Sequence, residues 1–166
     1  MSLSKSFLKE LESEGESTRK MLSRVPEEHF TFQPHDKSFA MGHLARHIAE
    51  IPGWVELMVS HNELDFASMK YTPPVIETNA DLMKCFEDNL KVAREEFLKA
   101  DDSKYSDNWT MRSGEQVFFT MSKEAVIRKW VLNHIIHHRA QLGVYLRLLD
   151  IPVPGMYGPS ADDTGM

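Results

Sequence analysis

Residues 122–149 place apolar side chains at steps of three and four along the whole segment, the pattern of an amphipathic helix. His134 and His138 continue this apolar stripe, where an imidazole without a partner would be costly to bury. Side chains four residues apart on a helix have Cβ atoms about 5–6 Å apart, so two ring nitrogens can reach one metal ion at about 2.0–2.1 Å. This pattern favours a metal site on the buried face of this helix, completed by another element, over two histidines that only pack in the core.

A second histidine pair with the same separation, His43 and His47, lies in another helical segment, residues 38–60. His47 shares the inward stripe of that segment, whereas His43 is nearer the helix start and can face water. We therefore expect His47 to be the third ligand beside His134 and His138. Three imidazoles leave a fourth position open for water or substrate, as in catalytic zinc sites.

Four segments have the helical period, and one domain covering residues 1–166 is expected from the length. Four amphipathic helices joined by connections of unequal length are typical of an all-α four-helix bundle, here with a long crossover between the second and third helices. The tail, residues 150–166, is rich in Pro and Gly and should be irregular. The predicted helices cover residues 4–25, 38–60, 79–100 and 122–149.

Local signals refine these bounds. Ser38 and Ser122 are expected to cap the second and fourth helices, and Thr78 begins the start signal of the third. Pro52 lacks the amide hydrogen that would bond the preceding turn, so the second helix should kink one turn beyond its histidine pair. Residues 101–121 change to aromatic and β-branched side chains around a Ser-Gly pair, which predicts a loop or a short hairpin.

Composition excludes several classes of function. The formal net charge is −6, from 19 basic and 25 acidic residues, so no broad basic surface for DNA or RNA is expected. No apolar run approaches the about 20 residues that span a bilayer, and no targeting signal is recognised, so the protein is expected in the cytoplasm. The single cysteine, Cys85, cannot form an intramolecular disulfide and is interpreted as a small buried hydrophobe, not a nucleophile.

The remaining histidines and the neighbours of the main pair have simpler interpretations. His137 lies on a flanking face of the last helix, and Arg139 is expected to form a salt bridge within the bundle. Any of the three tryptophans could line a dry, apolar pocket beside an open metal position, and the sequence does not choose among them. Solvated side chains are expected at His29, His35 and His61, and the tryptophans are Trp54, Trp109 and Trp130.

Several motifs together resemble the DinB family of metal-binding four-helix bundles, which is related to thiol-dependent transferases and the mycothiol-dependent maleylpyruvate isomerase. They are His-Ile-Ala-Glu at residues 47–50, Asn-His-Ile-Ile-His-His-Arg-Ala-Gln at 133–141, Tyr-Leu-Arg at 145–147 and Tyr-Gly-Pro-Ser-Ala-Asp at 157–162. The resemblance implies a bundle with a long link between helices two and three, homodimers, and a divalent metal ion. Its ligands would fall on His47, His134 and His138.

The resemblance leaves the metal open. Zinc is the first expectation and nickel the next, and iron, manganese and copper are the further candidates. Relatives with ergothioneine-type sulfur chemistry carry a His-x3-His-x-Glu iron motif, and here Ala49 stands where that motif has glutamate. Oxygen activation is therefore not expected.

The resemblance also leaves the reaction open. The first hypothesis is an enzyme that transfers a low-molecular-weight thiol to a small electrophile, with the ion as Lewis acid and thiolate template. The alternatives are a non-catalytic stress-related protein with a structural metal and a hydrolase that activates metal-bound water. A fourth protein ligand, His43 or Glu50, would favour the structural role. The sequence identifies no catalytic side chain beyond the ligands.

Overall fold

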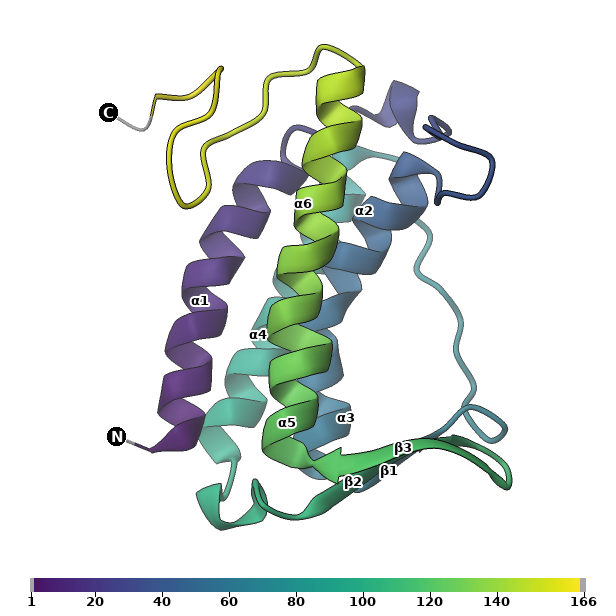
Figure 1. Ribbon diagram of the computed structural model, residues 1–166, viewed down its shortest axis with the longest axis vertical. Coiled ribbons are helices and arrows are strands. Elements are labelled where there is room, and N and C mark those ends of the chain that lie inside the picture. Colours follow the sequence, from purple (N-terminus) through teal and green to yellow (C-terminus); the bar gives the residue numbers. More distant parts are fainter. Residues whose placement is uncertain (1, 165–166) are drawn as a thin grey trace.

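The computed structural model describes residues 2–164, and four helical rods dominate it (Figure 1). The rods run side by side along the long axis, with a small sheet at one end. The first and third rods contact each other, as do the second and third and the second and fourth. The predicted all-α four-helix bundle is thus confirmed, with the sheet as an addition. The helices are α1 (Leu3–Leu22), α2 (Met41–Glu50), α3 (Trp54–Ser60), α4 (Asn79–Lys99), α5 (Lys123–Ile127) and α6 (Asn133–Leu148).

The second rod consists of α2 and α3 with a 3₁₀ turn, η2 (Ile51–Gly53), between them. Pro52 lies in this turn, so the predicted break one turn beyond His47 is confirmed. The predicted cap at Ser38 is wrong, because α2 begins at Met41. The first two amides of α2 donate to backbone carbonyls of the preceding loop, Met41 N to Phe32 O and Gly42 N to Phe30 O. They therefore need no side-chain cap.

The fourth rod consists of α5, a π-helical turn η4 (Arg128–Leu132) and α6. Ser122 caps α5, since its hydroxyl accepts a hydrogen bond from the amide of Ala125, and this confirms the prediction. Thr78 and Asp81 likewise form a capping box at the start of α4. The π turn was not predicted, because the apolar period of the sequence continues through it.

The sheet has three strands, β1 (Glu63–Asp65), β2 (Asn108–Ser113) and β3 (Gln116–Ser122), in the order β1-β2-β3. The antiparallel pair β2 and β3 is the hairpin that the sequence offered as one of two alternatives, with Gly114 at φ +58° in its turn. β1 was missed. It lies parallel to β2, and from its end the long crossover returns along the bundle to the start of α4 (Figure 1).

The core fills the space between the rods and continues under the sheet, where Trp109 is fully buried. Helical periodicity had placed most of its members on inward faces. Within residues 2–164, no helix has the length and apolarity needed to cross a membrane. The largest core side chains include Phe7, Leu11, Leu44, Ile48, Phe86 and Leu90.

Candidate metal centre

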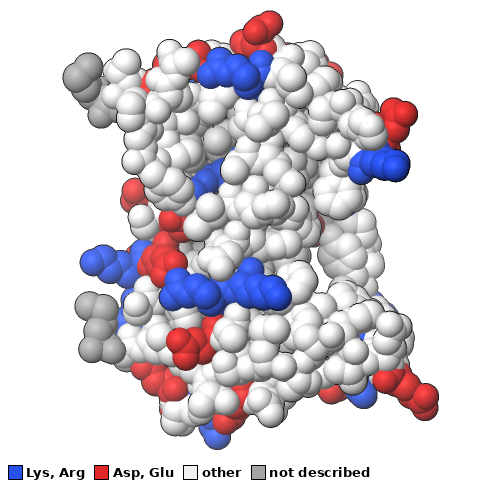
Figure 2. All heavy atoms as spheres, viewed as in Figure 1, with Lys and Arg blue, Asp and Glu red and all other residues white. Residues whose placement is uncertain are grey.

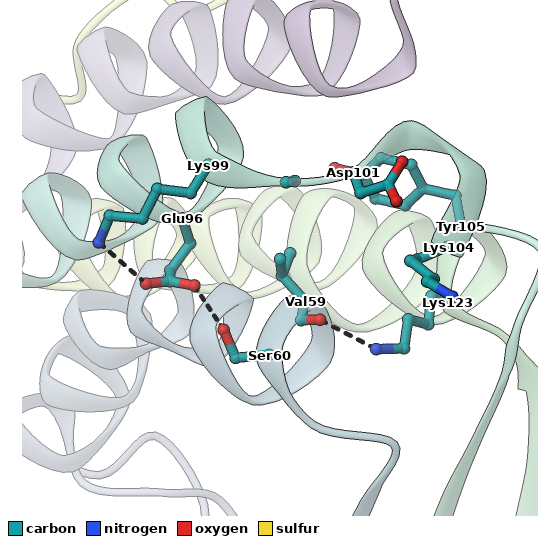
Figure 3. A pocket seen from close by; sticks show the side chains of 9 residues that line it. Val59, Ser60, Glu96, Lys99, Asp101, Lys104, Tyr105 and Lys123 are labelled. Carbon is teal, nitrogen blue, oxygen red and sulfur yellow. Dashed lines mark hydrogen bonds and ion pairs between the residues drawn. The ribbon is translucent and has the colours of Figure 1, made fainter.

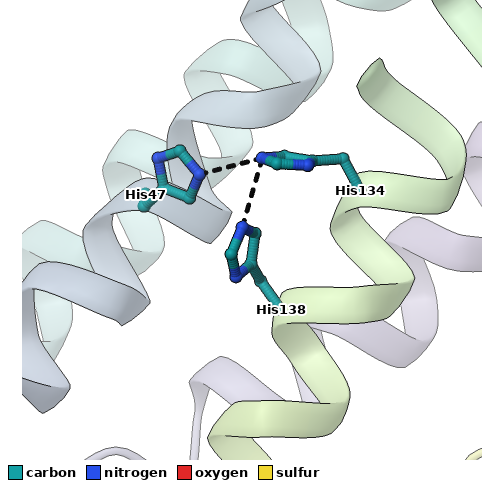
Figure 4. Close-up of side chains that lie close together, drawn as sticks. All are labelled: His47, His134 and His138. Atoms are coloured by element: carbon teal, nitrogen blue, oxygen red, sulfur yellow. Dashed lines mark hydrogen bonds between the residues drawn. The ribbon is translucent and has the colours of Figure 1, made fainter. Parts of the chain in front are cut away.

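Three imidazoles from two rods meet between α2 and α6 (Figure 4). His134 and His138 project from successive turns of α6, and His47 projects from the last turn of α2, which contacts α6. The Nε2 atom of His134 lies 3.1 Å from Nε2 of His47 and 3.2 Å from Nε2 of His138. The three residues singled out in the sequence are therefore brought together, with ligand atoms all within 4.8 Å of one another.

These distances fit a shared ion. Two nitrogens bound at about 2.1 Å lie about 3.0 Å apart when the angle at the ion is a right angle, and about 3.4 Å apart at the tetrahedral angle. The observed separations of 3.1 and 3.2 Å fall between these values. The three-histidine group could thus hold a metal ion.

His138 is oriented by a further side chain. Its Nδ1 lies 2.7 Å from Oε1 of Gln141, one turn along α6. Since the amide oxygen can only accept, Nδ1 carries the hydrogen and Nε2 presents its lone pair to the cluster. Sequence reasoning missed Gln141 as a functional residue, although its i+3 spacing from His138 places it on the same helix face.

The histidines are electrically neutral at pH 7. Burial, with smaller contributions from the neighbouring imidazoles, lowers the pKa of His47 and of His134 from 6.5 to about 4, and Arg46 contributes at His47. Burial also lowers the pKa of His138. No carboxylate is among the groups that shift these three pKa values. Neutral imidazole is the form that binds a metal ion.

Hydrogen bonding between the rings does not account for their approach. His138 already uses its hydrogen toward Gln141, so its Nε2 can only accept. A single hydrogen on Nε2 of His134 cannot serve both the contact to His138 and the contact to His47. A cation shared by three lone pairs would satisfy all of them, which supports the fit of this donor set to a metal.

Neither candidate for a fourth ligand joins the group. The ring of His43 stacks on Phe39, with centroids 4.3 Å apart. Glu50 accepts a hydrogen bond of 2.5 Å from the Tyr71 hydroxyl and forms an ion pair with Arg46 at 3.8 Å. Among the described residues, the metal-type group at this place therefore contains three ligands, all of them imidazoles.

Two of the three tryptophans lie beside the cluster. The ring centre of Trp54 is 5.3 Å from that of His47 and 5.6 Å from that of His134, and the ring centre of Trp130 is 5.7 Å from that of His134. Trp109 belongs instead to the core, where its indole N–H donates to Leu57 O. The π turn η4 contains Trp130 and ends just before α6, and such turns occur often at functional sites.

Arg139, Cys85 and the other histidines lie in surroundings that agree with the sequence interpretation. Arg139 is buried and donates to Glu14 at 2.7 Å, so the predicted salt bridge within the bundle is confirmed. Cys85 is half-buried, and burial raises the pKa of its thiol, which does not favour a thiolate nucleophile. His137 is exposed beside His138, as are the loop residues His35 and His61, while His29 is partly exposed.

A separate pocket of about 300 Å³ lies between the ends of α3 and α4 and the start of α5 (Figure 3). Its polar groups largely satisfy each other: Lys123 donates to Val59 O at 2.9 Å, and Glu96 accepts from Ser60 and pairs with Lys99. None of the three clustered histidines lines it. It is therefore distinct from the candidate metal centre.

Comparison with known proteins places this architecture. The model of the DinB family matches residues 1–165. A curated relative, the uncharacterized protein YrdA of Bacillus subtilis (strain 168), is 25% identical over 157 residues, which cover 95% of this chain and 89% of that protein.

Two solved structures are similar in fold. A DinB-like protein from Bacillus cereus ATCC 10987 has a TM-score of 0.70 at 22% identity, covering 92% of this chain and 97% of that one. The DinB-like protein YjoA of Bacillus subtilis has a TM-score of 0.67 at 14% identity, covering 87% and 92%. At these identities the likeness concerns the fold alone.

Proposed function

Because the chain belongs to the DinB family, and because three imidazoles converge in its bundle, we propose that His47, His134 and His138 bind a divalent metal ion in an enzyme that transfers a low-molecular-weight thiol to a small electrophile. The observation that carries the proposal is the convergence of three neutral Nε2 atoms without a carboxylate or a fourth histidine. Zinc is the first candidate and nickel the second, since all-imidazole sites accept both.

The donor set suits an anionic ligand. A divalent ion held here would act as a Lewis acid that lowers the pKa of a bound thiol. The three imidazoles are neutral and Glu50 is engaged by Tyr71 and Arg46, so within residues 2–164 the group contains no negative charge that would compensate the ion. A thiolate would supply that charge.

The transfer itself requires little from the protein beyond position. The sulfur forms a bond to the electrophilic carbon, the leaving group departs with the electron pair of its own bond, and the thiol proton passes to solvent. His47 and the α6 pair would hold the ion that positions the sulfur, and the rings of Trp54 and Trp130 lie next to these histidines.

Three protein ligands would leave one coordination position of the ion free, which favours a catalytic over a purely structural metal. Structural zinc sites are usually closed by four protein ligands. Here the two residues that could close the site have other partners, Phe39 for His43 and Tyr71 for Glu50. A hydrolase would use the same open position, and the requirement for a thiol separates the two reactions.

Turnover by the metal-loaded protein tests the proposal. Zinc- or nickel-loaded protein is mixed with an aryl halide electrophile and a panel of small thiols, and loss of the electrophile is followed. We expect thiol-dependent turnover that His134→Ala abolishes together with metal retention, while His61→Ala, at an exposed loop histidine, leaves both intact. Full activity of His134→Ala after chelation would contradict the enzyme proposal, and turnover of an ester without thiol would favour the hydrolase.

The expected homodimer is also a proposal. A shallow apolar groove lies between α6 and the C-terminal segment, and Figure 2 shows few charged side chains over that part of the surface. Val144 and Leu148 are exposed there, and Arg147, the one charged residue of the lining, is paired with Asp162, so a second copy of the chain can cover this apolar surface. Light scattering should give a dimer mass that Val144→Arg reduces to a monomer mass. The groove is lined by Met21, Ala140, Gly143, Val144, Arg147, Leu148, Val153 and Met156.

A further inference from the structure

Trp54 and Trp130 lie beside the cluster without being fully buried, in contrast to Trp109, which is 0% exposed. Trp54 contacts both His47 and His134, so it lies where the second and fourth rods meet. Large rings gain most when all of their apolar surface is buried. Two partly exposed indoles beside the same histidine therefore leave apolar surface that a ligand can cover.

Phe39 extends this apolar surface from the loop before α2. It is 46% exposed, stacks on His43 and lies 6.3 Å from the ring of His47. Its exposure is high for a phenylalanine that is placed by two ring contacts. We refer to Phe39, Trp54 and Trp130 together as the aromatic wall.

The position of Trp130 lowers the stability of the fold, because its polar group is left without a hydrogen bond within residues 2–164. Its indole Nε1 is buried and has no hydrogen-bond partner among the described residues. The ring is fixed instead by stacking on Phe119 of β3, at 5.5 Å and an interplanar angle of 10°. An unsatisfied buried donor costs stability and needs a reason. The ring contact with His134 supplies one, since it places an apolar surface next to the metal-binding nitrogens.

Two cationic side chains lie near the cluster and the aromatic wall: the Nζ atom of Lys129 is 5.8 Å from the centre of the Trp130 ring, and the charge of Arg46 acts on His47. Arg46 is the one guanidinium that acts on the pKa values of the three histidines, and it pairs with Glu50. The other contributors to those pKa values are burial, the neighbouring imidazoles and the side-chain amide of Gln141, which raises the pKa of His138. Apart from these two cations and the atom that would bind the ion, the neighbours of the cluster are aromatic rings, which suit an apolar ligand.

From these contacts we infer that the aromatic wall selects ligands that carry an aromatic group next to the metal-binding atom. This inference rests on the proposed metal site and specifies its substrate class: an aromatic thiol or an aromatic electrophile is preferred over its small aliphatic counterpart. The preference comes from stacked and edge-to-face ring contacts together with the apolar area removed from water.

A pair of chelating probes with the same metal-binding group tests the inference without relying on thiol chemistry. Cobalt-loaded protein is titrated with benzohydroxamate and with acetohydroxamate, and the visible spectrum of cobalt reports binding. We expect benzohydroxamate to bind the wild-type protein about tenfold more tightly. Equal dissociation constants for the two probes would overturn the inference.

Substitutions then assign the preference to the wall. Trp54→Ala, Trp130→Ala and Phe39→Ala should each reduce the ratio of the two dissociation constants at least threefold while cobalt affinity stays unchanged, and Trp54→Phe should retain most of it. Phe39→Ala changes an exposed ring and should leave the fold intact. Phe66→Ala is the matched control, because Phe66 is 47% exposed and contacts Phe118 of the hairpin, not the histidines.

The outcomes separate this inference from the proposed function. A cobalt spectrum that is absent before any probe is added would remove the metal site and both proposals with it. Strong discrimination between the hydroxamates without thiol-dependent turnover would support the aromatic wall and contradict thiol transfer. A ratio that none of the three alanine variants changes would overturn the wall even if turnover is observed.

Discussion

Gln141 orients His138 through one hydrogen bond of 2.7 Å, and this bond fixes which ring nitrogen faces the cluster. Gln141→Leu removes the acceptor, so the His138 ring is free to rotate and to change tautomer. We expect metal affinity to fall about 10–100-fold with little loss of helix content. Competition with a chromophoric chelator measures the affinity. Gln141→Glu keeps an acceptor oxygen and should bind as tightly as the wild-type protein, so an equal loss in both variants would contradict this role.

The lowered pKa values of His47 and His134 give the metal-free protein a pH dependence of defined sign. In the unfolded chain these groups take up protons near pH 6.5, whereas in the folded protein they do so near pH 4. The unfolded state therefore binds more protons between these values, and stability should fall as the pH drops from 6.5 to about 4. Urea unfolding across this range measures the slope. His47→Gln combined with His134→Gln should flatten it, and an unchanged slope would show that other groups cause it.

At the scale of residues, the convergence of His47, His134 and His138 could be predicted from the sequence, whereas the side chains around them could not. His134 and His138 reveal themselves by i, i+4 spacing on an apolar stripe, and His47 by its place on the inward face of another helix. The choice of Trp54 and Trp130 over Trp109 depends on how β3 and the two rods pack in three dimensions. No local pattern in the sequence contains that information.

Among the elements, the break between α2 and α3 brings the second rod very close to α4. A Cβ atom added at Gly53 would lie 2.1 Å from Oδ1 and 3.0 Å from Cγ of Asn89, whose amide donates to Cys85 O. Gly53→Ala should therefore displace Asn89, break that bond, and lower the free energy of unfolding by about 1–2 kcal/mol. Chemical denaturation measures the loss. The double variant with Asn89→Ala should cost less than the sum of the two single variants, and strict additivity would exclude the steric cause.

Signals confined to a few residues predicted element boundaries well. The capping box at Thr78, the Ser122 cap and the Pro52 break are all local, and all are observed. Ser38 failed because backbone carbonyls of the preceding loop bind the first amides of α2. The strand β1 was missed because it is three residues long and exists through pairing with β2, about forty-five residues later in the chain. The π turn η4 was missed because the apolar period of the sequence continues through it.

At the scale of the whole molecule, a buried ion pair and a hydrogen bond to the same carboxylate connect three distant parts of the chain. Arg139 of α6 is 2% exposed and donates to the carboxylate of Glu14 in α1, while the hydroxyl of Tyr157 in the C-terminal segment donates to the same carboxylate. Arg139→Met would leave Glu14 buried without its cation and should lower the free energy of unfolding by about 3–5 kcal/mol. Tyr157→Phe should cost about 1 kcal/mol. Urea denaturation of both variants measures the losses, and a loss below 1 kcal/mol for Arg139→Met would show that Glu14 is solvated.

The architecture could be predicted because four amphipathic periods and one long connection leave few ways to bury four apolar stripes. The ion pair between Arg139 and Glu14 was foreseen only as a salt bridge of Arg139 somewhere in the bundle. Its partner, 125 residues away in the chain, depends on the rotation of α1 against α6. Such rotations follow from the packing of complete side chains, which a single sequence does not specify.

His47 and His134 are 87 residues apart in the chain, and they approach each other only where the second and fourth rods touch. A nascent polypeptide leaving the ribosome therefore lacks a complete binding site until the last rod has been synthesised and docked. Fragments that end before residue 134 should bind the metal ion poorly, however well their earlier helices form. Uptake of the ion would thus mark the moment at which the last rod docks against the second.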